Sequence, residues 1–227
     1  MSALARHISI GMATVRVVAR RMGFGYAQQV SSRLLDEMIV LRSDEELELR
    51  ARGLVEIRDI LNGLGIPYCL SGGALLGAIR DGDFIRWDWD VEIDTRTECV
   101  HPKREALISE LESARFQIIK HDSSKMNFKV KAAKYGSRYE ILGYYRMGRM
   151  RYRRMSRYPD SLLDGASEVP LRGERYSTFQ VPERYLEWMY GEWKTPVRSA
   201  DIDEYATGSS RTRARDRVRL RIMTLIR

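Results

Sequence analysis

Residues 70–94, with the sequence LSGGALLGAIRDGDFIRWDWDVEID, constrain the fold of this chain more than any other segment. The segment leaves an apolar strand, turns through two glycines into a short apolar helix, and returns through a polar turn to a second strand. Side chains two residues apart on a strand point to the same side of a sheet. The acidic residues of the second strand are therefore expected to share one face: Asp88, Asp90 and Glu92.

The chemistry of this segment indicates phosphate and metal binding. Three carboxylates on one strand face repel one another unless a cation lies among them, and hard divalent cations prefer such oxygen ligands. The Ser71-Gly72-Gly73 turn lets backbone N–H groups approach a ligand, and the helix that follows directs its positive end at the turn. Separately, the glycines would also fit a plain strand–helix turn and the acids a solvated strand face. Together they indicate metal-assisted phosphoryl or nucleotidyl transfer.

The same segment resembles the signature of the LicD/fukutin-like family, a branch of the polymerase-beta-like nucleotidyltransferase superfamily. The family pattern is roughly S-G-T-L-L-G-A-V-R-x-x-G-F-I-P-W-D-D-D-I-D-I. The matching positions are Ser71, Gly72, Leu75, Leu76, Gly77, Ala78, Arg80, Phe84, Ile85, Trp87, Asp88, Asp90 and Ile93. Residues 181–196 (VPERYLEWMYGEWKTP) resemble the family's C-terminal pattern with a shorter spacer. The resemblance spans roughly residues 50–200.

The resemblance implies an active site built on the acidic strand. Asp88 and Asp90 would bind one or two Mg²⁺ ions, with Mn²⁺ as a substitute, and Glu92 or Glu140 would complete the ligand set. The implied catalytic residues are Asp88, Asp90 and Glu140, and either Asp90 or Glu140 would act as general base. Glu140 would also fit a solvent-facing position on its strand.

Two further groups of residues are expected to contact the substrates. The residues expected to hold the donor phosphates are Ser71, Gly72, Gly73 and Arg80. Residues 144–158 contain six arginines, four tyrosines and no acid; arginine forks match phosphate geometry and tyrosine can stack on a base. The candidates for binding a donor diphosphate or an anionic acceptor are Arg146, Arg149, Arg151 and Arg153. An exposed basic hairpin without a specific ligand would fit the same pattern.

The chain departs from the family pattern at three positions. Trp89 replaces the middle aspartate, and the alternation predicts that its side chain faces the core. Glu92 replaces the fourth aspartate with a longer carboxylate, and Arg86 replaces the proline before the tryptophan. Metal binding is expected to survive these changes, which bear on the identity of the substrate more than on the presence of a site.

The order of predicted elements fits an α+β fold, and the resemblance implies a nucleotidyltransferase-like mixed β-sheet flanked by helices, with extra N-terminal and C-terminal helices. Ser43 and Glu46 have the spacing of a capping box and predict a helix to about Leu64. The other predictions are a helix at 102–114, strands at 115–121, 126–132, 138–147 and 176–181, a loop at 158–175, and a helix beginning at Pro182. The predicted domains are an N-terminal basic helical arm at 1–42, a catalytic domain at 43–200, and a basic C-terminal tail at 201–227.

The net charge of +8 lies at the two ends of the chain. Residues 1–35 contain five arginines and no acid, and residues 208–227 contain seven arginines and one aspartate, so the segment between carries −3. Basic ends favour an anionic membrane surface, or a partner protein, over specific nucleic-acid binding. Two cysteines, no run of about 18 apolar residues and no secretion signal predict a cytoplasmic protein, peripheral at the inner face of the membrane.

The resemblance implies a function in surface-glycan synthesis. Family members move a phospho-alcohol unit, such as phosphocholine or a polyol phosphate, from a CDP-linked donor to a sugar hydroxyl of a glycan or lipid-linked glycan in polysaccharide or lipopolysaccharide. Two alternatives remain open: an NTP-dependent nucleotidyltransferase, and a non-catalytic, membrane-associated member of the family.

Overall fold

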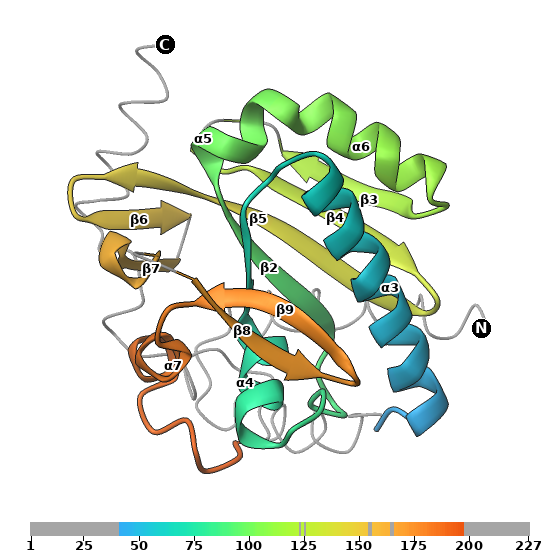
Figure 1. Ribbon diagram of the computed structural model, residues 1–227, viewed down its shortest axis with the longest axis vertical. Coiled ribbons are helices and arrows are strands. Elements are labelled where there is room, and N and C mark those ends of the chain that lie inside the picture. Colours follow the sequence, from blue (N-terminus) through green and yellow to red (C-terminus); the bar gives the residue numbers. More distant parts are fainter. Residues whose placement is uncertain (1–40, 123, 125, 154–155, 164–165, 198–227) are drawn as a thin grey trace, which may run out of the picture. The chain divides into compact units, whose positions relative to one another are not determined.

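The computed structural model describes residues 41–197, apart from 123, 125, 154–155 and 164–165 (Figure 1). Residues 41–196 belong to one compact unit. The predicted N-terminal arm, except for residues 41 and 42, and the predicted tail at 201–227 lie outside the described residues. Within the described part of the chain, no helix is long and apolar enough to span a membrane.

The centre of the unit is a mixed sheet, as predicted. Its strands follow the order β1 (Tyr68–Ser71), β2 (Asp90–Arg96), β5 (Ser137–Met147), β4 (Lys129–Lys134) and β3 (Gln117–Asp122). β2 and β5 are parallel, and the other neighbours are antiparallel. β6 (Met150–Arg153) and β7 (Ser156–Pro159) continue the sheet from the end of β5. The acidic strand β2 therefore lies inside the sheet, between β1 and β5.

Helices cover the apolar face of this sheet (Figure 1). α3 (Asp44–Gly63) begins with the predicted capping box of Ser43 and Glu46. The hydroxyl of Tyr139 donates to the carbonyl of Arg50 in α3 at 2.9 Å. A Cβ on Gly53 would lie 2.2 Å from the same Tyr139 oxygen, so only glycine allows this close approach.

A short helical segment precedes the second helix on this face. α5 (Thr97–Val100) and a 3₁₀ turn (His101–Lys103) lead into α6 (Arg104–Ser113), where the sequence predicted one helix at 102–114. Pro102 lies in the 3₁₀ turn, where its missing N–H removes no helical hydrogen bond. Leu107 and Leu111 of α6 are buried in the core.

A separate hairpin packs against β1 and α4 (Gly72–Arg80). It consists of β8 (Ala166–Leu171) and β9 (Glu174–Phe179), and α7 (Pro182–Tyr190) follows it. The hydroxyl of Thr178 donates to the carbonyl of Leu70 at 3.0 Å. The prediction of a loop at 158–175 was wrong for β8, because Pro170 was taken as a loop residue. In a two-stranded hairpin each strand has a free edge, where proline is tolerated.

Candidate active site

The glycine turn and the acidic side chains meet at one place, although about fifteen residues separate them in the sequence. Gly72 has a φ of +57°, and a Cβ there would lie 1.9 Å from Glu92 Oε2. A Cβ on Gly73 would lie 2.0 Å from Asp88 Oδ2. The two carboxylates therefore fill the space that larger residues would take.

Ser71, the last residue of β1, occupies the N-cap position of α4 but its side chain does not cap the helix. Its hydroxyl donates instead to Asp94 Oδ1 at 2.8 Å. The backbone N–H of Gly72 donates to the hydroxyl of Tyr185 at 3.3 Å. The N–H groups of the first turn of α4 are thus left without the serine cap, which is the usual partner at this position.

Asp94 is a site residue that sequence reasoning missed. It is buried on β2, on the same face as Asp90 and Glu92, and its Oδ2 is buried without a hydrogen-bond partner. The signal was available, because the alternation of acids from Asp88 continues to Asp94.

Burial and mutual repulsion hold protons on these carboxyl groups. Burial, with the charges of Asp88 and Glu140, raises the pKa of Asp90 to about 7. Burial, with the charges of Asp90 and Asp94, raises the pKa of Glu92 well above its ordinary value. Burial also raises the pKa of Asp94 to about 7. A cation would relieve the same repulsion without protons.

The donor set fits a hard divalent cation in its chemistry. Asp88, Asp90 and Glu92 offer half-buried carboxylate oxygens, which suit Mg²⁺. In the side-chain arrangement of residues 41–197, outside the gaps noted above, no three His, Cys, Asp or Glu side chains form a group that could hold a metal ion. A cation at those three acids would therefore require their side chains to move from this arrangement.

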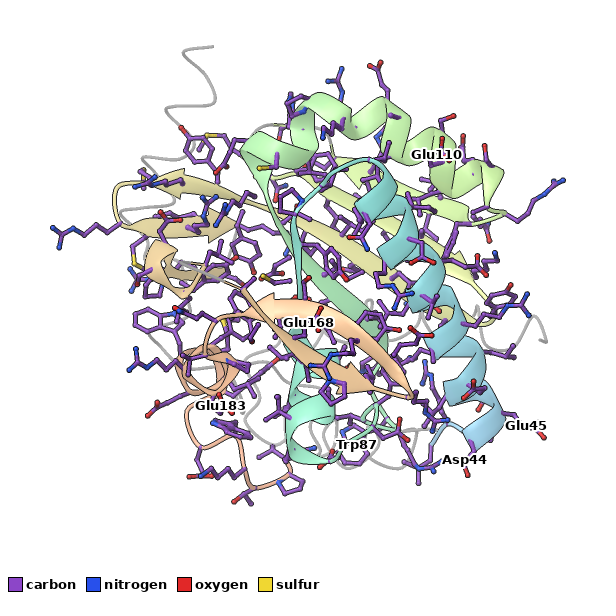
Figure 2. The ribbon with its side chains drawn as sticks, in the orientation of Figure 1. Asp44, Glu45, Trp87, Glu110, Glu168 and Glu183 are labelled. Atoms are coloured by element: carbon purple, nitrogen blue, oxygen red, sulfur yellow. The ribbon has the colours of Figure 1, made fainter. Side chains whose placement is uncertain are left out.

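Two expectations about this turn were wrong. β2 begins at Asp90, so Asp88 lies in the turn before the strand, where its Oδ1 accepts the N–H of Trp89 at 2.9 Å. The side chain of Trp89 was expected in the core but the residue is 47% exposed. The alternation rule sets the facing of side chains only inside a strand, and Trp89 precedes it. Figure 2 labels the neighbouring Trp87 in the same turn, between α4 and β2.

Two arginines that the sequence analysis did not select hold the Asp88 turn. Arg50 is fully buried, and its guanidinium donates to the carbonyl of Asp88 at 3.0 Å and to Ser137 Oγ at 3.3 Å. Burial lowers the pKa of Arg50 to about 10. Arg42 donates to the carbonyl of Trp89 at 3.5 Å. The sequence held a signal for Arg50, because this arginine stands among the apolar residues of the buried face of α3.

Glu140 lies beside the acids but does not have the chemistry expected of it. It is the cross-strand partner of Glu92, and it is buried. One carboxylate oxygen pairs with Lys129 and the other with Lys131. Burial would raise the pKa of Glu140, but the hydrogen bonds from the two lysines outweigh it and hold that pKa below its ordinary value. The expectation of a general base is therefore corrected, because a weakly basic, doubly paired carboxylate is a poor proton acceptor.

Arg80 does not lie at the glycine turn. It ends α4, a helix of nine residues, so about 12 Å of helix separates it from the turn. Its guanidinium pairs with Asp81, at 2.8 Å to Oδ1 and 2.7 Å to Oδ2. The expectation that Arg80 binds the donor phosphates is corrected accordingly.

Of the four arginines proposed for substrate binding, Arg153 alone acts electrostatically on the acids. Burial raises the pKa of Asp94, and the positive charge of Arg153 opposes that rise. Arg151 is buried and pairs with Glu98 and Asp160, so it stabilises the fold. Arg146 also pairs with Asp160, at 3.0 Å, and Arg149 is exposed beside the β5–β6 turn. Sequence position does not reveal which arginines of a basic hairpin find acidic partners inside the protein.

Comparisons with known proteins place the chain in a family. The family model for the LicD/FKTN/FKRP nucleotidyltransferase domain matches residues 65–179, just over half of the chain. Two relatives match a shorter part of this chain: the ribitol 5-phosphate transferases FKRP of Mus musculus and Homo sapiens. Each is 49% identical to this chain over 41 residues, which cover 18% of this chain and 8% of the relative. The chain thus aligns with less than a tenth of the length of these curated relatives.

Two solved structures resemble the chain at low identity. One is ANT(2")-Ia in complex with adenylyl-2"-tobramycin, at 14% identity and a TM-score of 0.42, covering 56% of this chain and 67% of that one. The other is a Thermotoga maritima protein described as a nucleotidyltransferase, at 16% identity and a TM-score of 0.41, covering 66% of this chain and 85% of that one.

Proposed function

Because this chain belongs to the LicD/FKTN/FKRP nucleotidyltransferase-domain family, we propose that it is a transferase that moves a phospho-alcohol unit from a CDP-linked donor to a sugar hydroxyl of a surface glycan. One observation carries the proposal: the carboxylates of Glu92 and Asp88 lie directly against Gly72 and Gly73. The oxygens proposed to bind a cation and the turn proposed to bind phosphate thereby lie at one place. The partial match to ribitol 5-phosphate transferases favours a polyol phosphate over phosphocholine.

The glycine turn and α4 would bind the donor phosphates. The first-turn N–H groups of α4 carry the positive end of the helix dipole, and Ser71 does not occupy them because it bonds to Asp94. Asp88, Asp90 and Glu92 would hold Mg²⁺, which neutralises phosphate charge and lowers the pKa of an attacking hydroxyl when it is bound.

Asp90 is the better candidate for general base. Its pKa is about 7 in the chain without a cation, and a bound cation would lower that pKa, so Asp90 would act as general base where it is not itself a ligand of the cation. Glu140 has a lowered pKa and both of its oxygens are paired with lysines. The proton of the sugar hydroxyl is therefore assigned to Asp90.

Calorimetric titration of the full chain with CDP-glycerol and CDP-ribitol, in Mg²⁺ and in EDTA, tests the proposal. Binding is expected only with Mg²⁺, and Asp90→Asn should weaken it at least about tenfold, as removal of a charged ligand does. The matched control is Glu110→Gln, an exposed carboxylate on α6 that Figure 2 labels. Mg²⁺-dependent binding of CTP or ATP without binding of either CDP-alcohol would instead establish the nucleotidyltransferase alternative.

A further inference from the structure

Glu140, Lys129 and Lys131 form a charged trio on the site face of the sheet. The charge of Glu140 adds to the effect of burial in raising the pKa of Asp90, but the two lysines have no role in the function proposed above. We propose that Lys129 and Lys131 form a subsite for a phosphate group of a substrate, and that Glu140 occupies it as an internal anion. The phosphate is identified through the proposed transfer reaction, so the inference rests on that function.

The strand register places the trio next to the acids. Ser71, Glu92, Glu140 and Lys131 are successive cross-strand partners on β1, β2, β5 and β4. Neighbouring strands are about 4.8 Å apart, so Lys131 lies two strands, roughly 10 Å, from Glu92 along the same face. The charge of Lys131 also reaches Asp90: burial raises the pKa of Asp90, and Lys131 opposes that rise.

The trio contains two positively charged side chains and one negatively charged side chain. Two ammonium groups serve one carboxylate, so these three side chains alone sum to +1, while Asp90 and Glu92 lie near enough to Glu140 for their charges to interact with it. An ammonium group has three donors, and the side chains of Lys129 and Lys131 remain 20% and 23% exposed. Lys134 of the same strand differs, because it pairs with Glu56 and also donates to the carbonyl of Ala114 at 2.6 Å. Lys129 and Lys131 therefore keep donors for a ligand at the edge of the site.

A phosphate is the anion that best fits this position. Lysine binds phosphate as a point charge, and the adjacent acids and glycine turn are the proposed site of phosphoryl transfer. The phosphate would compete with the Glu140 carboxylate for the two ammonium groups. Removing the charge of Glu140 should accordingly strengthen anion binding, and that gain should be lost when Lys129 or Lys131 is also neutralised.

Titration of the full chain with inorganic pyrophosphate in EDTA tests the subsite. Glu140→Gln is expected to raise the affinity at least about fivefold, and Lys129→Met or Lys131→Met to lower it by a similar factor. Lys131→Arg, which keeps the charge, should retain affinity. Lys120→Met is the matched control, because Lys120 is exposed on β3 and is the cross-strand partner of Lys131. A gain of affinity in Glu140→Gln cannot arise from misfolding.

Three results would overturn the subsite: no gain in Glu140→Gln, no loss in the Lys129 and Lys131 variants, or an equal loss in Lys120→Met. Failure of the proposed function is separable, since it shows as absent Mg²⁺-dependent binding of CDP-alcohols while the pyrophosphate pattern persists. If CDP-glycerol with Mg²⁺ displaces pyrophosphate, the subsite serves the donor. If both bind together, it serves a phosphate of the acceptor.

Discussion

At the scale of single residues, the candidate site depends on space left beside two glycines and on a helix start that its N-cap serine does not cap. Gly72 and Gly73 leave the volume that the carboxylates of Glu92 and Asp88 fill. Asp94 keeps the hydroxyl of Ser71 away from the start of α4. The Ser71–Asp94 hydrogen bond would therefore be a positioning contact: it keeps Ser71 from capping the first-turn N–H groups of α4, which are proposed to bind the phosphate.

Substitution at Asp94 and Ser71 should show epistasis. Asp94→Ala frees the Ser71 hydroxyl to cap α4, a contact worth about 1 kcal/mol, and so should weaken Mg²⁺-dependent binding of CDP-glycerol about fivefold. Adding Ser71→Ala removes the competing cap and should restore the affinity in calorimetric titration. Ser71→Ala alone is expected to bind as the unmodified chain does. Equal weakness of Asp94→Ala and the double variant would contradict the competition.

At the scale of elements, the hairpin of β8 and β9 holds the loop that carries Asp88. Arg172, with a φ of +48°, lies in the hairpin turn, and its guanidinium donates to the two carboxylate oxygens of Asp83 at 2.7 and 2.6 Å. It also donates to Glu48 of α3 at 3.4 Å. The hydrogen bond from Arg172 is the main reason that the pKa of Asp83 is lowered. One side chain thus connects the hairpin, α3 and the α4–β2 loop.

Loss of that connection should cost stability. Arg172→Met is expected to lower the free energy of unfolding by about 1 kcal/mol, because a half-buried, bidentate pair is lost. Arg175→Met on the same hairpin is the matched control; its pair with Glu168 is mostly exposed, so a change below about 0.5 kcal/mol is expected. Urea denaturation measures both, and equal losses would show that the bidentate geometry adds nothing.

Local signals in the sequence predicted the helices and turns well, but they did not predict which distant residues contact one another. The capping box at Ser43 and the glycine turn are set by residues close in the chain, and both are present. The facing of Trp89 depends on where β2 starts, and the role of Arg151 depends on Glu98, 53 residues away. Asp94 continues the alternation of acids along β2, whereas its hydrogen bond with Ser71 depends on the pairing of β1 with β2. Non-local pairing is what sequence periodicity does not encode.

For the molecule as a whole, the buried acids make stability depend on pH. In the folded chain the pKa values of Asp90 and Asp94 are raised from 3.8 to about 7. The folded state therefore binds protons that the unfolded chain has already released, so stability is greatest below about pH 4 for these groups and falls as the pH rises through 7.

The expected measurement is a melting temperature that falls between pH 5.5 and 8 in EDTA. Mg²⁺ should oppose the fall, because a cation replaces the lost protons and binds the folded state preferentially. Asp94→Asn should flatten the profile, since an amide does not titrate. A melting temperature that rises across this range in EDTA would contradict the raised pKa values.

The parallel pairing of β2 with β5 also has a consequence for how the chain comes together during synthesis. β2 ends at Arg96, but β5, the strand that pairs with it in parallel, begins only at Ser137. Until then one edge of the future central strand has no partner, and exposed strand edges invite association between chains. Before β5 forms, the negative charges of the alternating acids on β2 should repel the same strand of other chains. Neutralising Asp90 and Glu92 should therefore lower the refolding yield, although it removes repulsion between these side chains in the folded protein.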